Sequence, residues 1–104
     1  MPDVIIDKFL SKTHDFARKL KAVYLFGSRA RGDDKPYSDY DLLVVMETRD
    51  EGLVDKLYDA VVAVLLETGK VISLKIFCEA DFKRLSSIPT PFMARVLKEG
   101  IKIG

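Results

Sequence analysis

The run Asp41–Met46, with the sequence DLLVVM, limits the fold of this chain more than any other segment. Its apolar residues fall on both alternations of a strand, whereas a strand with one wet face shows apolar and polar residues in turn. Both faces of this strand therefore need cover from other parts of the chain. We expect a central strand in a layered structure, with packing elements on each side of a sheet.

The segments around this run alternate between strand-like and helix-like patterns. Short β-rich or alternating runs predict further strands, over residues 22–26, 71–77 and, at the end, 101–103. Apolar residues at three- and four-residue steps, with caps and glycines at the ends, predict helices over residues 4–20 and 50–67, from Asp81, and from Thr90 to Gly100. This order predicts an α+β fold, with a small mixed α/β sheet flanked by helices.

The length and composition fit one soluble domain. The chain has 104 residues, of which 48% are hydrophobic and 32% charged, and we expect a single domain over residues 1–104. The net charge of +1 supplies no overall field for nucleic acid or an anionic membrane, so electrostatic recognition has to be local. Direct binding to nucleic acid is not expected, because the sequence has no basic stripe with interleaved aromatic residues.

The sequence is typical of a cytoplasmic protein. It has no apolar stretch of membrane-spanning length, and its acidic first residues are unlike those of a signal peptide. Cys78 is the only cysteine, which excludes an internal disulfide and suits a reducing compartment. We therefore expect a cytoplasmic location and no membrane partner.

Asp39 and Asp41 stand at the mouth of the strand that begins the central run. Residues two apart project from one face of a strand, and their side chains start about 6.6 Å apart. Two converging carboxylates make a hard oxygen site for a divalent cation, and Mg²⁺ is often held by one or two carboxylates together with substrate phosphates. The alternative is a pair of exposed acids in a turn.

The segment upstream of these acids carries groups that favour an anion. Gly27 lets the chain bend after a strand, and a helix opening at Ser28 would present amide donors to a phosphate. Arg29, Arg31 and Lys35 supply cations close by. Phosphate donors that face a carboxylate pair would together hold a metal-bound nucleoside triphosphate. The alternative is a simple turn with solvated arginines.

The run from Gly27 to Gly32 also satisfies the first part of a P-loop pattern. That motif continues with Lys and then Ser or Thr, because the lysine contacts the phosphates. Here Asp33 and Asp34 follow, and acids at these positions would repel a phosphate, so we reject a P-loop. Tyr37, close to the carboxylate pair, is a candidate for stacking on a nucleobase.

The run GSRARG followed by SDYDLLVV resembles the signature of the minimal nucleotidyltransferase (MNT) family, a branch of the DNA polymerase β-like superfamily. The pattern is Gly-Ser, Ala-Arg-Gly and then Ser-Asp-x-Asp-Leu, and its positions are all present here at 27, 28, 30, 31, 32, 38, 39, 41 and 42. The order of elements over about residues 3–78 also suits the family. The resemblance implies the mixed-sheet nucleotidyltransferase fold.

The resemblance also implies roles for individual residues. Asp39 and Asp41 would be the catalytic residues that bind Mg²⁺, in a site of the two-metal type with ATP or another nucleoside triphosphate as substrate. Nucleotide and phosphate binding would fall to Gly27, Ser28, Arg31 and Ser38. The reaction would be attack of an acceptor hydroxyl on the α-phosphate, with release of pyrophosphate. Whether Arg31 contacts phosphates or braces the loop against an acid stays open at this point.

The family's complete site has a third carboxylate, on the strand after the second long helix. In this chain the matching position is Ser73, and no acid lies anywhere from 68 to 78. Lys75 shares the face of Ser73 and would oppose a second cation. Glu79 is the nearest acid downstream and is a weak candidate to stand in.

Two functions are consistent with this pattern. In the first, the protein is a nucleotidyltransferase that transfers AMP to a hydroxyl, for example a tyrosine of a HEPN-type toxin for which it is the MNT antitoxin. In the second, it is a degenerate MNT-like antitoxin that holds a helical partner, with or without nucleotide, and transfers nothing. The helix expected over residues 50–67 has two apolar stripes, which predicts burial on two sides. That surplus surface suits a HEPN-type partner or a homodimer equally well.

Overall fold

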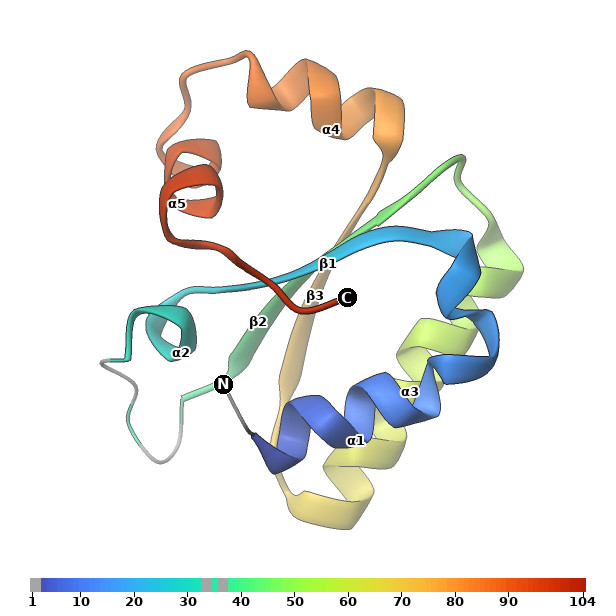
Figure 1. The fold of residues 1–104 in the computed structure, drawn as a ribbon. Coiled ribbons are helices and arrows are strands. Elements are labelled where there is room, and N and C mark those ends of the chain that lie inside the picture. The colour runs from blue at the N-terminus through green and yellow to red at the C-terminus, as the bar shows by residue number, and fades with distance from the viewer. Residues whose placement is uncertain (1–2, 33–34, 36–37) are drawn as a thin grey trace.

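A computed structural model of the chain describes residues 3–32, 35 and 38–104, apart from the side chain of Ser28. Its centre is a four-stranded mixed sheet in the order β3-β2-β1-β4 (Figure 1). The strands are β1 Leu20–Phe26, β2 Tyr40–Met46, β3 Ile72–Cys78 and β4 Ile101–Lys102. β1 runs antiparallel to both of its neighbours, β2 and β4, whereas β2 and β3 are parallel. The predicted mixed sheet is confirmed, including the short last strand.

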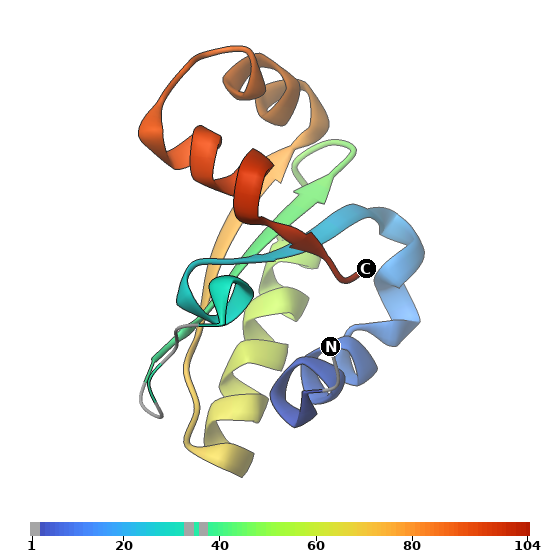
Figure 2. The same cartoon turned by 60° about the vertical axis from the view of Figure 1, so that its left-hand side comes forward.

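Helices cover both faces of this sheet (Figures 1 and 2). The helices are α1 Val4–Lys12, the 3₁₀ helix η1 His14–Lys19, α2 Ser28–Arg31, α3 Glu51–Thr68, α4 Glu79–Ser86 and α5 Pro91–Glu99. α1 and α3 lie on one face, and α4 and α5 lie on the other. None of the helices in the described part of the chain is long and apolar enough to cross a membrane.

β2 is the central strand that its sequence predicts. Leu42, Val44 and Met46 belong to the core shared with α1 and α3. Leu43 and Val45 pack on the opposite face, in a smaller cluster with Val96 of α5 and Phe82 of α4. Since all five of these β2 side chains are buried, the expected cover on both faces is confirmed.

The single helix expected over residues 4–20 is wrong, because α1 ends at Lys12. Thr13 leaves the helical conformation, with φ −100° and ψ 1°, and its Oγ1 donates to the carbonyl of Leu10 at 3.2 Å. A β-branched hydroxyl residue that bonds back to the preceding turn favours such a break. The apolar period nevertheless continues through Phe16, which packs on the core from η1.

The ends of α3 follow from its sequence, but this chain alone does not bury the helix on two sides. Gly69, with φ +74°, ends the last turn as expected, and Asp50 caps the first turn, where the sequence analysis placed the first residue of the helix. Along the second apolar stripe, however, the exposed fractions are 47% for Tyr58, 51% for Val62 and 81% for Leu66. α1 covers only one flank of α3, and no other described element covers the opposite flank.

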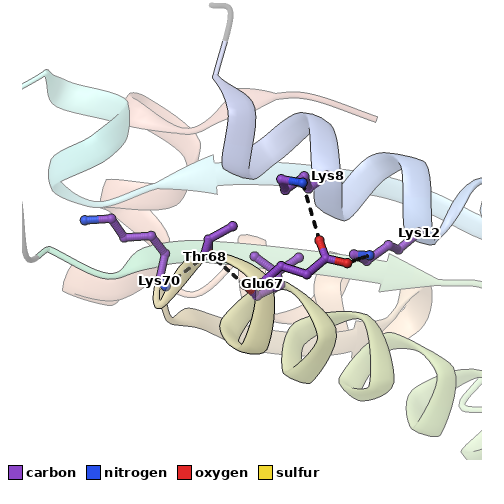
Figure 3. A network of polar contacts seen from close by, with 6 residues as sticks. Lys8, Lys12, Glu67, Thr68 and Lys70 are labelled. Atoms are coloured by element: carbon purple, nitrogen blue, oxygen red, sulfur yellow. Dashed lines mark hydrogen bonds and ion pairs between the residues drawn. The ribbon is translucent and has the colours of Figure 1, made fainter.

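The C-terminal end of α3 is tied to α1 by charged side chains (Figure 3). The carboxylate of Glu67 lies 3.4 Å from Lys8 Nζ and 2.8 Å from Lys12 Nζ. Hydrogen bonding to Lys12, and more weakly to Lys8, lowers the pKa of Glu67 from its usual value. Thr68 Oγ1 donates to the carbonyl of Val64 at 2.7 Å, which further secures this end of the helix.

Candidate active site

The turn from β1 into α2 brings Gly27 against the mouth of β2. Phe26 pairs with Asp41 in the β1–β2 register, so Gly27 lies directly beside the Asp41 side chain. A Cβ atom on Gly27 would overlap the carboxylate of Asp41, and the φ of +76° is itself left-handed. The bend therefore requires glycine for two independent reasons.

α2 is one turn long and begins directly after this bend. The amides of Ala30 and Arg31 both donate to the carbonyl of Gly27, at 3.1 Å each. These two amides are therefore not available to a phosphate. Of the amide donors expected at the start of α2, only those of its first residues can bind one. Ser28, the first of them, is predicted to bind phosphate, but its side chain lies outside what the structure describes.

Asp39 and Asp41 flank Tyr40 at the start of β2. Asp39 is exposed and Asp41 is partly buried. Burial raises the pKa of Asp41 and the negative charge of Asp39 raises it further, while Lys75 and Arg31 act in the opposite direction. A cation bound between the two carboxylates would remove this repulsion, so the donor set fits a divalent metal ion. Among the described residues, no group of three or more His, Cys, Asp or Glu side chains forms a larger metal site.

Tyr40 and Arg29 form the support beneath the two acids. Tyr40 is buried on the opposite side of β2, and its hydroxyl donates to the Asp3 carboxylate at 2.9 Å. The guanidinium of Arg29 lies 4.2 Å from the centre of the Tyr40 ring, and Arg29 Nη2 donates to the carbonyl of Ser38 at 2.8 Å. Arg29 is therefore a buried brace of the loop. The expectation that it adds a cation for phosphates is wrong.

Ser38 closes the same loop. Its Oγ accepts from the amide of Lys35 at 2.8 Å, while its carbonyl accepts from Arg29. Because the Ser38 hydroxyl is the acceptor in this bond, its own hydrogen can still donate to a phosphate oxygen, so the predicted phosphate contact is compatible with the loop. Tyr37, the candidate for stacking, lies outside the described residues, as do Asp33 and Asp34.

Arg31 contacts one acid and lies near a second. Its Nη1 lies 3.3 Å from the carboxylate of Glu99, which braces α2 against α5. It also lies close enough to Asp41 to lower the pKa of that carboxyl. The bracing contact predicted as one alternative is thus present, on an acid near the end of the chain.

A cavity of about 340 Å³ opens beside Gly27, Arg31 and Asp41. Its other walls are Phe26 and two residues of α5, Phe92 and Arg95. The rings of Phe26 and Phe92 meet edge to face, with centroids 5.6 Å apart. The volume lies within the range of small-molecule sites, and the cavity combines cations, a carboxylate and aromatic faces.

Phe92 and Arg95 were missed by the sequence analysis. They stand three residues apart and so share one face of α5, which is a signal in hindsight. That face meets the site because α5 returns to β1 through β4, and the sequence does not show which strand the last segment joins.

The third strand places Ser73 directly beside Asp41 in the parallel β2–β3 register. Lys75 lies one step further on the same face, opposite Leu43. β3 ends at Cys78, about 16 Å along the strand from Ser73, and Glu79 lies beyond it in α4, where its carboxylate pairs with Lys21 at 3.9 Å and Lys83 at 3.1 Å. The candidate stand-in Glu79 is therefore wrong. Ser73 occupies the position where the family's third acid is expected.

This arrangement of strand, glycine turn and paired aspartates agrees with a comparison to protein families. A family model described as "Polymerase beta, Nucleotidyltransferase" matches residues 6–104. The match covers nearly the whole chain, and the chain belongs to this family. The expected nucleotidyltransferase fold is thereby confirmed.

Two proteins of Methanocaldococcus jannaschii are similar in sequence. "Putative protein adenylyltransferase MJ1305" is 38% identical over 73 residues, which cover 66% of this chain and 50% of that protein. "Putative protein adenylyltransferase MJ0604" is 35% identical over 82 residues, which cover 79% of this chain and 76% of that protein. The chain thus spans about half the length of the first relative and about three quarters of the second.

Solved structures share the fold at lower identity. A toxin–antitoxin with AMP-PNP matches 93% of this chain and 70% of the other, with a TM-score of 0.61 and 22% identity. A tri-AMPylated Shewanella oneidensis HEPN toxin in complex with MNT antitoxin matches 95% of this chain and 68% of the other, with a TM-score of 0.55 and 20% identity. At such identities the likeness shows the fold alone.

Proposed function

We propose that this chain, as one domain over residues 1–104, is a Mg²⁺-dependent nucleotidyltransferase that moves AMP from ATP onto a hydroxyl of a protein. The observation that carries the proposal is the packing of Gly27 against Asp41, beside a cavity lined with cations. Glycine at this position lets the backbone of the turn pass directly against the Asp41 carboxylate, at the wall of the cavity where the phosphates would bind. The names of the two M. jannaschii relatives support adenylyl transfer as the reaction.

Each residue of the site has a part in this proposal. Asp39 and Asp41 would hold Mg²⁺, which when bound would neutralise charge on the phosphates and on the leaving pyrophosphate. Arg31 and Arg95 would orient the phosphates from two sides of the cavity. Phe92, from α5, would provide an apolar wall for the rest of the nucleotide. In the transfer, the acceptor oxygen bonds to the α-phosphorus while the bond to the β-phosphate oxygen breaks, and the hydroxyl proton is released.

We further propose that the acceptor is a tyrosine of a HEPN-type toxin and that this chain is its antitoxin in the cytoplasm. Structural neighbours that are described as a toxin–antitoxin with AMP-PNP, and as an AMPylated HEPN toxin with MNT antitoxin, support this partner. Magnesium, ATP and the HEPN partner are parts of the proposal that follow from the family.

A second function is favoured by one observation, the serine beside Asp41. Ser73 is a poor metal ligand, and Lys75 adds a positive charge on the same face. A chain with two carboxylates in place of three could hold nucleotide and a helical partner without transfer. In that case it would be a binding antitoxin.

The two functions are separated by incubating the protein with Mg²⁺, α-labelled ATP and a HEPN-type protein encoded in the same genome. The transferase predicts label on the HEPN-type protein, lost in Asp39→Asn and in Asp41→Asn. Asp55→Asn is the matched control, because Asp55 is exposed on α3 and outside the site. A stable complex that forms without label in the wild type, and survives both site substitutions, would establish the binding antitoxin instead.

A further inference from the structure

β3 is an edge strand with an open side. It pairs with β2 on one side, and within the described residues no strand pairs with the other. The carbonyl of Val71, just before β3, accepts from the Tyr40 amide of β2 at 3.0 Å. Backbone groups alternate along a strand, so residues 72, 74 and 76 direct their amides and carbonyls to the open side. Lys75 is the only charged residue of this seven-residue strand, so the edge has little to prevent pairing with another strand.

An uncovered apolar flank of α3 lies on the side of this open edge. Leu57 and Val64 face the sheet, and the flank with Glu67 faces α1. At 100° of rotation per residue, the helix surface opposite Glu67 is formed by Tyr58, Val62 and Leu65. These side chains are 47%, 51% and 40% exposed. Because α1 and the sheet occupy the other sides of α3, this flank points past β3.

We propose that a second copy of this chain docks on this combined surface. β3 pairs antiparallel with β3 of the second copy about a two-fold axis perpendicular to the sheet, and the two α3 helices pack against each other. Such an axis keeps both helices on the same face of one continuous sheet, and each copy offers the same strand and the same flank. The proposal goes beyond the transferase and holds whether or not AMP is moved.

The spacing of the elements fits this dimer. α3 connects the adjacent parallel strands β2 and β3, contacts β3, and shares one buried cluster with both strands, so we place its axis over the gap between them. The two helix axes would then be about two strand spacings apart, roughly 9.6 Å, which agrees with the usual 8–10 Å between packed helices. A purely helical partner would cover the flank but would leave the β3 edge unpaired.

The charge on β3 selects one register. With the axis at Leu74, the backbone groups of residues 72, 74 and 76 in each strand all form hydrogen bonds with the second copy. Lys75 then lies opposite Ser73 of the second copy. With the axis one residue later, Lys75 would lie opposite its own counterpart, and like charges in a cross-strand pair are unfavourable. The dimer centred on Leu74 would therefore bring a partner lysine next to Ser73, beside the Asp41 of each site. No residue of β3 lines the cavity itself.

The first test is the mass in solution by analytical ultracentrifugation, over micromolar to sub-millimolar concentrations. We expect twice the chain mass of 11.7 kDa for the wild type. Leu65→Lys should raise the dimer dissociation constant about tenfold or more, because it places a charge in the contact between helices. Leu66→Lys is the matched control on the same helix: its side chain is more exposed and points away from the edge, so the dimer should persist. A monomeric wild type, or equal effects of both substitutions in folded protein, would overturn the proposal.

The second test locates the strand pair by disulfide formation in a Cys78→Ser background. Ser73→Cys with Lys75→Cys places directly opposed cysteines across an axis at Leu74, where facing Cα atoms in a pair without mutual hydrogen bonds are about 4.5 Å apart. Val71→Cys with Lys75→Cys would be opposed only if the axis lay at Ser73. We expect a covalent dimer from the first pair alone. A covalent dimer from the second pair, with or without one from the first, would refute the register, because an axis at Ser73 or Lys75 sets that residue opposite its own counterpart and crosslinks both variants. No covalent dimer from either pair would refute pairing through β3.

Discussion

Gly27 allows the site to form because it has no side chain: the Asp41 carboxylate occupies the space that a Cβ atom would fill. Gly27→Ala should therefore lower stability by about 1–3 kcal/mol, from left-handed strain and from displacement of Asp41. Gly32→Ala is a matched control: Gly32 has a similar φ of +83°, but an added Cβ would meet nothing within 4 Å. Thermal unfolding followed by circular dichroism measures both. Equal losses would mean that the contact with Asp41 adds nothing.

Asp41 is strained electrostatically in the absence of a cation. Its pKa is raised in the folded protein, so its charge opposes folding at neutral pH, and this cost disappears as the pH falls through the raised pKa. Asp41→Asn should accordingly raise Tm, by about 2–4 °C, in metal-free buffer. Adding MgCl₂ should raise Tm of the wild type and leave that of Asp41→Asn nearly unchanged. A variant that is less stable than the wild type without metal would contradict this account.

Ser73 lies where one substitution can complete a set of three acids. Ser73→Asp would place a carboxylate beside Asp41 in the parallel register, and we expect its affinity for Mn²⁺ or Mg²⁺ to rise about tenfold or more. Ser73→Asn is the control, because it adds an oxygen of similar reach without the charge. Isothermal titration calorimetry with each metal gives the comparison. If both variants bind metal as the wild type does, Ser73 does not face the metal site.

At the scale of elements, the sequence predicts the type and order of the segments better than their ends and neighbours. β2 can be recognised in the sequence because its apolar residues fall on both faces of the strand. α3 can be recognised because Asp50 and Gly69 are typical residues for the two ends of a helix. The break at Thr13 is hidden because η1 keeps apolar residues in step with α1. The sequence of α3 predicts that its second stripe is buried, although it is exposed in this structure. Apolar periodicity indicates that a surface is suited to burial, but it does not show whether the same chain covers it.

The link between α1 and α3 gives a prediction about salt. Glu67→Gln removes the charge that pairs with Lys8 and Lys12, and these groups are exposed. Because the folded state lowers the pKa of Glu67, its stabilisation is present at neutral pH and is lost as the pH falls through that lowered pKa. We expect the variant to unfold slightly earlier than the wild type at low ionic strength and equally at about 1 M NaCl. A difference that persists in high salt would show a role other than charge pairing.

For the whole molecule, the predictable part of the site is the part that lies close together in the sequence. Gly27, Asp39 and Asp41 fall within one strand–turn–strand unit, and the sheet register brings them together as their spacing suggests. Arg29 is misread because its charge indicates a surface role, whereas it is buried over Tyr40. The wall supplied by α5 depends on β4 pairing with β1 at the end of the chain, a long-range contact that no local pattern encodes.

That long-range wall yields a prediction for nucleotide binding. Arg95 lines the cavity from α5, opposite Asp41 and Arg31, and its positive charge should attract the triphosphate. Arg95→Ala should weaken binding of Mg²⁺–ATP about tenfold, measured by fluorescence of a labelled ATP analogue. Arg84→Ala is the control, because Arg84 is exposed on α4 and pairs with Asp81 at 2.9 Å, outside the cavity. Unchanged binding in Arg95→Ala, with the fold intact, would place the nucleotide elsewhere and leave α5 with a structural role only.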